Sequence, residues 1–230
     1  MSHEEIEQML EVPEQKKFIP VKTSEAAFIY EWIRAHGLLR TLEVGFGYAR
    51  SAAYIMSATG SSHIAMDPFQ SNYNNLGLKN AERLGLLPLL DFRHDYSHNV
   101  LPQLLRENRR FEFIFIDGSH KYDGIFLDFY YSDLLLEQGG YVMLHDTWMR
   151  STQLVMSFIR RNKRNYHYVK TPLRNLALFR KQGEDTRNWT FFREFYTVRS
   201  VFLHPIIAWL HTGQTTPLKR FLLVLKERLN

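Results

Sequence analysis

The sequence contains no cysteine, which excludes disulfide bonds, thiolate metal sites and cysteine nucleophiles. It has no run of eighteen apolar residues, so we expect no membrane-spanning helix. Internal repeats and low-complexity stretches are also missing. Residues 1–11 are polar and acidic and lack the basic-then-apolar layout of a signal peptide, which makes the cytoplasm the expected location.

The chain does contain enough apolar material for a packed core. Of its 230 residues, 45% are hydrophobic and 23% are charged, the balance of a globular protein. This composition excludes a largely disordered or fibrous chain. The length suits one domain with additions better than two full domains.

Charge is distributed unevenly along the chain. Residues 1–150 hold 14 Lys and Arg against 20 Asp and Glu, a net charge of −6, whereas residues 151–230 hold 15 against 4, a net charge of +11. The basic part also carries 12 aromatic residues. It is either a solvated helical face over an aromatic core or a surface for nucleic acid, an anionic membrane or an acidic substrate.

The hydrophobic pattern alternates short apolar strands with amphipathic helices, which predicts βαβ units and a doubly wound α/β sheet. The expected strands are 41–44, 63–66, 91–94, 111–116 and 141–144, and the expected helices are 24–39, 51–58, 75–84, 100–108, 122–136 and 153–161. The run 111–116 is almost unbroken in its apolar character, as in a strand buried on both faces. Gly139 and Gly140 are expected to turn the preceding helix into the last of these strands.

The pattern changes after residue 161. Strands at 166–170 and 177–180 are separated by only six residues, too few for a helical crossover, so they should pair antiparallel. From residue 188 onward we expect helices whose aromatic residues pack on the sheet edge or on a second subunit; this favours a homodimer. The predicted organisation is a helical segment 1–40, a main domain 41–182 and a basic aromatic helical extension 183–230.

A glycine loop follows the first strand, in the sequence Glu43-Val-Gly-Phe-Gly-Tyr-Ala-Arg-Ser51. Gly45 and Gly47 allow a tight turn and a close backbone approach to a ligand, although a purely conformational role is the alternative. The third glycine of a dinucleotide loop is missing. Glu43 is unfavourable beside a pyrophosphate but suits a ligand with an ammonium group, and Asp67 ends the next strand where an acid can bind ribose hydroxyls.

Together with this loop and Asp67, two further motifs resemble the class I S-adenosylmethionine-dependent methyltransferases. They are Phe-Ile-Asp117-Gly-Ser-His120-x-Tyr122 and Gly139-Gly-Tyr-Val-Met-Leu-His145-Asp146. The branch to which the chain is similar is the small O-methyltransferases related to catechol O-methyltransferase, over about residues 20–182. The resemblance implies a Rossmann-like seven-stranded sheet in the order 3-2-1-4-5-7-6, with the last strand antiparallel.

The resemblance also implies S-adenosylmethionine as the cofactor. Glu43 would face its methionine part, Gly45 and Gly47 would give backbone clearance, and Ser51 would bond the carboxylate. Ala49 replaces the glycine usual in this loop and should tighten the pocket. The remaining implied cofactor contacts are Asp67 to the ribose, the adenine-edge segment Asp95, Tyr96 and Ser97, and Asp117.

The resemblance places Asp117 and Asp146 at the ends of neighbouring strands, where the family holds a divalent cation that lowers the pKa of the acceptor hydroxyl. Adjacent strands lie about 5 Å apart, so both carboxylates can reach one ion, and carboxylates suit Mg²⁺, Mn²⁺ or Ca²⁺. The family's Asn after the second acid is replaced by Thr147. His120 and His145 also allow a transition metal or a metal-free histidine base, with His120 the nearest proton acceptor. In the alternative interpretation both acids only cap helices or order loops.

The leading functional hypothesis is O-methylation of a small hydroxylated metabolite or sugar. The alternative is a methyltransferase acting on a macromolecule, RNA or a lipid-linked substrate, through the basic extension. A nicotinamide-dependent oxidoreductase is disfavoured by the missing third glycine and the antiparallel final strands. A non-catalytic interaction protein that keeps the fold is the fourth hypothesis.

Overall fold

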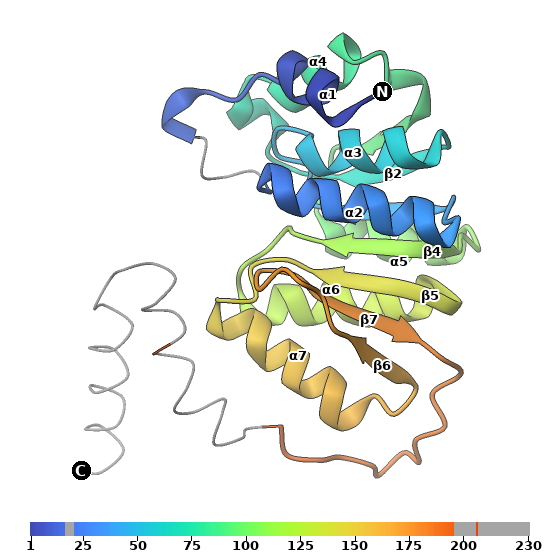
Figure 1. The fold of residues 1–230 in the computed structure, drawn as a ribbon. Coiled ribbons are helices and arrows are strands. Elements are labelled where there is room, and N and C mark those ends of the chain that lie inside the picture. Colours follow the sequence, from blue (N-terminus) through green and yellow to red (C-terminus); the bar gives the residue numbers. More distant parts are fainter. Residues whose placement is uncertain (17–20, 196–205, 207–230) are drawn as a thin grey trace.

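The computed structural model describes residues 1–16, 21–195 and 206. Its centre is a seven-stranded sheet in the order β3-β2-β1-β4-β5-β7-β6, with helices on both faces (Figure 1). The first five strands are parallel, and β7 is antiparallel to both of its neighbours. The predicted strand order and antiparallel last strand are confirmed. The strands are β1 (Thr41–Val44), β2 (His63–Met66), β3 (Leu90–Arg93), β4 (Phe111–Ile116), β5 (Leu136–Leu144), β6 (Tyr166–Val169) and β7 (Ala177–Lys181).

Two hydrophobic clusters fill the space between the sheet and its helices. One face carries α1 (His3–Met9), α2 (Thr23–His36), α3 (Arg50–Thr59) and α4 (Leu76–Arg83). The other carries α5 (Ser97–Arg106), α6 (Tyr122–Leu135) and α7 (Arg150–Asn162). Short 3-10 turns lie at η1 (Glu14–Lys16), η2 (Gln70–Tyr73) and η3 (Leu87–Leu89). Among the described residues, no helix is long and apolar enough to cross a membrane.

The position of β4 between two layers of helices explains why its sequence is apolar at successive positions. Phe113 and Phe115 belong to the cluster under α2 and α3, whereas Ile114 and Ile116 belong to the cluster under α5 and α6. Side chains alternate between the faces of a strand, so a strand covered on both sides needs apolar residues at nearly every position. The predicted burial of this strand on both faces is confirmed.

The predicted turn at Gly139 and Gly140 is wrong, because both glycines lie inside β5. Phe111 pairs with Leu136 and Phe113 pairs with Tyr141, so β5 uses extra residues to bulge against β4. A Cβ on Gly140 would lie 2.9 Å from the Glu112 carbonyl oxygen, and Gly139 has φ +85°. The bulge therefore requires glycine for close backbone approach rather than for chain reversal.

The helix expected from residue 188 is wrong for residues 188–195, which contain no helix, whereas the described residue 206 is helical. They run along the outer side of α7 (Figure 1). The Asn162 side chain donates to the Arg193 carbonyl at 2.9 Å and accepts from the Arg193 amide at 2.8 Å, so contacts with α7 replace helical hydrogen bonds. The rest of the expected helices, residues 196–205 and 207–230, lies outside the described residues.

Asp128 on α6 is a buried carboxyl whose two oxygens have no hydrogen-bond donor. Burial raises its pKa from 3.8 to about 6. The native state therefore binds this proton more tightly than the unfolded chain, and stability falls as the pH rises from about 4 to 6. We expect Asp128→Asn to be about as stable as the wild type at pH 4 and up to about 3 kcal/mol more stable at pH 7.

Urea unfolding of both proteins across this pH range measures the difference. A stability difference that does not change with pH would contradict burial of an ionisable group at this position.

Candidate functional site

A cavity of about 640 Å³ opens at the carboxyl edge of the sheet. The loops after β1, β2, β4 and β5 line it, together with Val21 before α2 and the start of α5. Strands β1 and β4 are adjacent in the sheet but far apart in the chain, so the cavity lies where the strand order reverses. Doubly wound sheets bind their ligands at this switch point.

The glycine loop is pressed against the loop that follows β4. Gly45 has φ +94°, and a Cβ there would lie 2.3 Å from the Asp117 carbonyl oxygen. Asp67 Oδ2 accepts the amide N–H groups of Phe46 at 3.2 Å and Gly47 at 2.8 Å. Gly45 thus gives clearance to the Asp117 backbone, and Asp67 fixes the loop while also lining the cavity.

Ala49 adopts the left-handed conformation, with φ +66°, and is fully buried. Its side chain packs in the hydrophobic cluster beneath α2 and α3 and does not line the cavity. The prediction that its methyl group tightens the pocket is therefore wrong. The glycine usual at this position serves the backbone conformation, which alanine adopts at a cost of about 1 kcal/mol.

Glu43 lies behind the cavity wall instead of on it. It is completely buried, accepts a hydrogen bond from the Ser51 hydroxyl, and lies 3.3 Å from His63 Nε2. Burial raises its pKa, against the influence of His63 and Ser51. Ser51 itself lines the cavity at the start of α3, so Ser51 lies between the Glu43 carboxylate and the cavity; a contact of Glu43 with the cofactor stays a prediction.

The segment predicted to hold the adenine edge is only partly on the cavity. Tyr96 and Ser97 line it, whereas Asp95 does not and instead accepts the Tyr96 amide N–H at 2.7 Å and the Asn99 side chain at 2.9 Å. Tyr96 is exposed, with Phe69 edge-on to it at 5.8 Å and His98 stacked on it at 5.2 Å. These aromatic rings line this end of the cavity, and their flat apolar faces suit a planar ligand.

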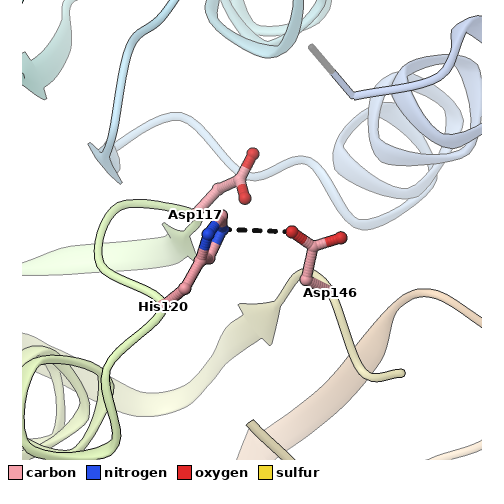
Figure 2. Close-up of side chains that lie close together, drawn as sticks. All are labelled: Asp117, His120 and Asp146. Carbon is pink, nitrogen blue, oxygen red and sulfur yellow. Dashed lines mark ion pairs between the residues drawn. The ribbon is translucent and has the colours of Figure 1, made fainter. Parts of the chain in front are cut away.

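Asp117, His120 and Asp146 come together at the ends of β4 and β5 (Figure 2). His120 Nε2 lies 3.1 Å from Asp146 Oδ2, and one ligand atom from each of the three residues lies within 4.8 Å of the others. The hydrogen bond to Asp146 raises the pKa of His120. Burial opposes ionisation of Asp146, but His120 and His145 outweigh it and hold the Asp146 pKa well below its usual range. The cluster therefore offers two carboxylates and an imidazole at the cavity wall.

His145 lies behind this cluster and is buried as a cation. Its Nδ1 is 2.9 Å from Asp117 Oδ1, and its Nε2 is 3.0 Å from Glu25 Oε2 on α2. Burial disfavours the charged ring, but Asp117 and Glu25 raise the pKa of His145 to about 11. Both ring nitrogens therefore have partners, and His145 lies behind the cavity wall rather than on it; its catalytic role stays a prediction.

The structure places nine of the twelve predicted site residues on the cavity. On the wall are Gly45, Gly47, Ser51, Asp67, Tyr96, Ser97, Asp117, His120 and Asp146; Glu43 and His145 are buried behind it, and Asp95 is exposed outside it. Sequence reasoning missed Arg50 and Val21 on the wall and Glu25 and Asn175 against His145. Arg50 adjoins Ser51 in the motif, a signal that was available. Glu25 and Asn175 belong to no motif, so the sequence gives no signal for their contacts with His145.

The comparisons with known proteins agree with this geometry. A family model described as a methyltransferase domain matches residues 42–147, which run from β1 to just beyond Asp146. No curated protein matches the sequence.

Several solved structures share the fold. An O-methyltransferase from Bacillus cereus in complex with SAH aligns with a TM-score of 0.63 at 16% identity, covering 78% of this chain and 90% of that one. An O-methyltransferase from Streptomyces achromogenes involved in tomaymycin synthesis, in complex with SAM, has a TM-score of 0.64 at 14% identity, with 79% and 89% covered. An SAH-bound methyltransferase from Podospora anserina has a TM-score of 0.64 at 13% identity, with 78% and 87% covered.

Proposed function

We propose, from the match of residues 42–147 to a methyltransferase domain model, that this chain moves a methyl group from S-adenosylmethionine to a hydroxyl group of a small acceptor. The prediction of a methyltransferase with the class I fold is confirmed by that domain and by the strand order. The proposal of a hydroxyl acceptor rests on one observation. Asp117, His120 and Asp146 form a cluster on the wall of the cavity that the glycine loop also lines.

The cofactor would lie along the loops after β1, β2 and β3. Ser51 and the amide groups at the start of α3 suit a carboxylate, because a helix N-terminus favours negative charge. Asp67 and Tyr96 both line the cavity, where Asp67 would bind the ribose and the Tyr96 ring would pack on the adenine. The three-residue cluster lines the same cavity, where an acceptor hydroxyl would meet the methyl group of a bound cofactor.

Methyl transfer is an in-line displacement, in which the acceptor oxygen bonds to the methyl carbon as the carbon–sulfur bond breaks. The products are the methylated acceptor and S-adenosylhomocysteine, and the acceptor proton must leave. The enzyme contributes positioning and proton removal. His120 has the exposure for this task, with half of its side chain accessible at the cavity wall.

The donor set of this cluster also fits a divalent cation. Asp117 and Asp146 would hold it with His120, and a carboxylate–carboxylate–imidazole set suits Mn²⁺ or another first-row transition ion better than Mg²⁺ or Ca²⁺. When bound, such an ion lowers the pKa of the acceptor hydroxyl. His120 serves either as its ligand or as the proton acceptor, because one nitrogen lone pair cannot do both.

The cofactor assignment is tested by ligand-induced stabilisation. S-adenosylhomocysteine should raise the melting temperature of the protein, and NAD should not, because only a ligand of the native state stabilises it. Asp67→Ala should weaken S-adenosylhomocysteine binding by roughly 1–3 kcal/mol, since it removes charge-assisted hydrogen bonds and leaves the Phe46 and Gly47 amides unpaired.

Calorimetry measures both effects, with Asp91→Ala on the neighbouring β3 as the control acid outside the cavity. Binding of NAD without binding of S-adenosylhomocysteine would exclude a methyltransferase cofactor site.

A further inference from the structure

Four arginines gather on the outer side of α7, at the end of the sheet where β6 forms the edge. Arg160, Arg161 and Arg164 lie at or just beyond the last turn of α7, and Arg193 belongs to the segment that runs beside it. All four are exposed. With Trp189 and Phe192 they form what we call the arginine–aromatic surface.

The four guanidinium groups are held in place without acidic partners. Among the described residues, no carboxylate forms an ion pair with any of them. Instead Arg160 lies 3.9 Å over the Tyr168 ring, and Arg164 and Arg193 lie 4.5 and 5.5 Å from the Phe191 ring. Arg161 is not stacked, and its Nε donates to the Glu194 carbonyl at 3.2 Å. Stacking leaves the N–H groups of a guanidinium free, and their planar fork matches a phosphate or carboxylate. The surface is therefore preorganised for an anionic partner.

Large aromatic side chains project beside these charges. Trp189 is 96% exposed and Phe192 is 59% exposed. Rings that stay exposed to water do not gain the favourable free energy that burial of their large apolar area would give. Trp in particular concentrates at the interface between a bilayer and water, where its apolar body and polar N–H are both satisfied.

The chain that follows has the composition of an interfacial segment. Residues 196–230 hold 17 hydrophobic residues out of 35, including Trp209, with 5 Lys and Arg against a single Glu. Basic segments rich in Trp, Phe and Leu are typical of protein parts that lie on anionic bilayers. Protein surfaces that bind nucleic acid are more polar than the composition of residues 196–230. The composition therefore favours a lipid partner over RNA.

We propose that the arginine–aromatic surface binds the surface of an anionic lipid bilayer. The arginines meet lipid phosphates and carboxylates, and Trp189 and Phe192 enter the interfacial region. The binding is separate from the proposed methyl transfer, because none of these residues lines the cavity.

The test is flotation of the full chain with vesicles of phosphatidylcholine alone or with added phosphatidylserine. The wild type should float only with the anionic vesicles, and less in high salt. The triple variant Arg160→Ala, Arg164→Ala, Arg193→Ala should lose roughly a hundredfold in vesicle affinity, since each arginine near an anionic surface contributes about fivefold. Trp189→Ala should weaken binding without changing its dependence on salt.

The matched control removes the same charge from a different part of the surface: Arg106→Ala, Arg109→Ala, Arg110→Ala, three exposed arginines between the end of α5 and the central strand β4. It should float like the wild type. The proposal is overturned if the wild type ignores anionic vesicles, if both triple variants bind equally, or if the surface retains RNA or a second copy of the chain but no vesicles. An unchanged stabilisation by S-adenosylhomocysteine shows that each variant is folded, and this control does not depend on vesicle binding.

Discussion

Replacing Asp146 with asparagine should reduce methyl transfer at least a hundredfold while leaving S-adenosylhomocysteine binding largely intact. The substitution keeps the size of the side chain but removes the charge that pairs with His120 at 3.1 Å. It removes one carboxylate from the possible metal site and also the group that orients the imidazole. Loss of a positioned acid–base or metal group typically costs a factor of about 10² to 10⁴.

Turnover is measured as S-adenosylhomocysteine formed with a panel of phenols and catechols, and cofactor affinity by calorimetry. Asp123→Asn is the matched control, since Asp123 is an exposed acid on the same cavity wall but outside the cluster. Equal activities of the two variants would remove Asp146 from the chemistry.

The same assay separates the two roles of His120. If a metal is required, EDTA should abolish turnover, Mn²⁺ should restore it, and His120→Ala should bind Mn²⁺ more weakly. If His120 is the proton acceptor, activity should survive EDTA and fall as the pH drops through a value above the ordinary histidine pKa of 6.5, because Asp146 raises it. Full activity in EDTA together with a silent His120→Ala would contradict both.

Replacing His145 with leucine should lower the free energy of unfolding by about 3–5 kcal/mol. The imidazolium lies between Asp117 at 2.9 Å, a part-buried contact, and Glu25 at 3.0 Å, a buried one. Removing one partner of a buried ion pair leaves uncompensated charge in a low-dielectric interior, which is the origin of this cost. Burial disfavours the charged form of Glu25, but hydrogen bonds from His145 and the Lys22 backbone outweigh it and lower the Glu25 pKa. The variant removes the His145 contribution and leaves this carboxyl with the cost of its burial.

Urea unfolding measures the loss, and His167→Leu on β6 is the control for an exposed imidazole. Combining His145→Leu with Glu25→Gln should recover part of the stability, since the second change neutralises the orphaned carboxylate. A loss below about 1 kcal/mol in the single variant would contradict a charged His145.

Much of the fold could be predicted from local sequence. The bounds 41–44, 63–66 and 111–116 of β1, β2 and β4 are confirmed as predicted, because each strand is a short apolar run stopped by glycine or aspartate. The antiparallel pairing of β6 and β7 followed from a connection too short for a helix. The place of the site also followed, since parallel strands bring the residues at their carboxyl ends to one edge.

The position of a residue along the backbone, however, does not determine which groups its side chain contacts. The sequence by itself determined that Glu43, Asp117, His120, His145 and Asp146 lie at strand ends, and it predicted similar roles for the two histidines. Only the tertiary structure decided between them. Asp117, together with Glu25 from a helix 120 residues away, raises the pKa of the buried His145, whereas His120 lies half exposed on the cavity wall. Ionisation depends on burial and on charges through space, and these come from elements that no sequence spacing connects.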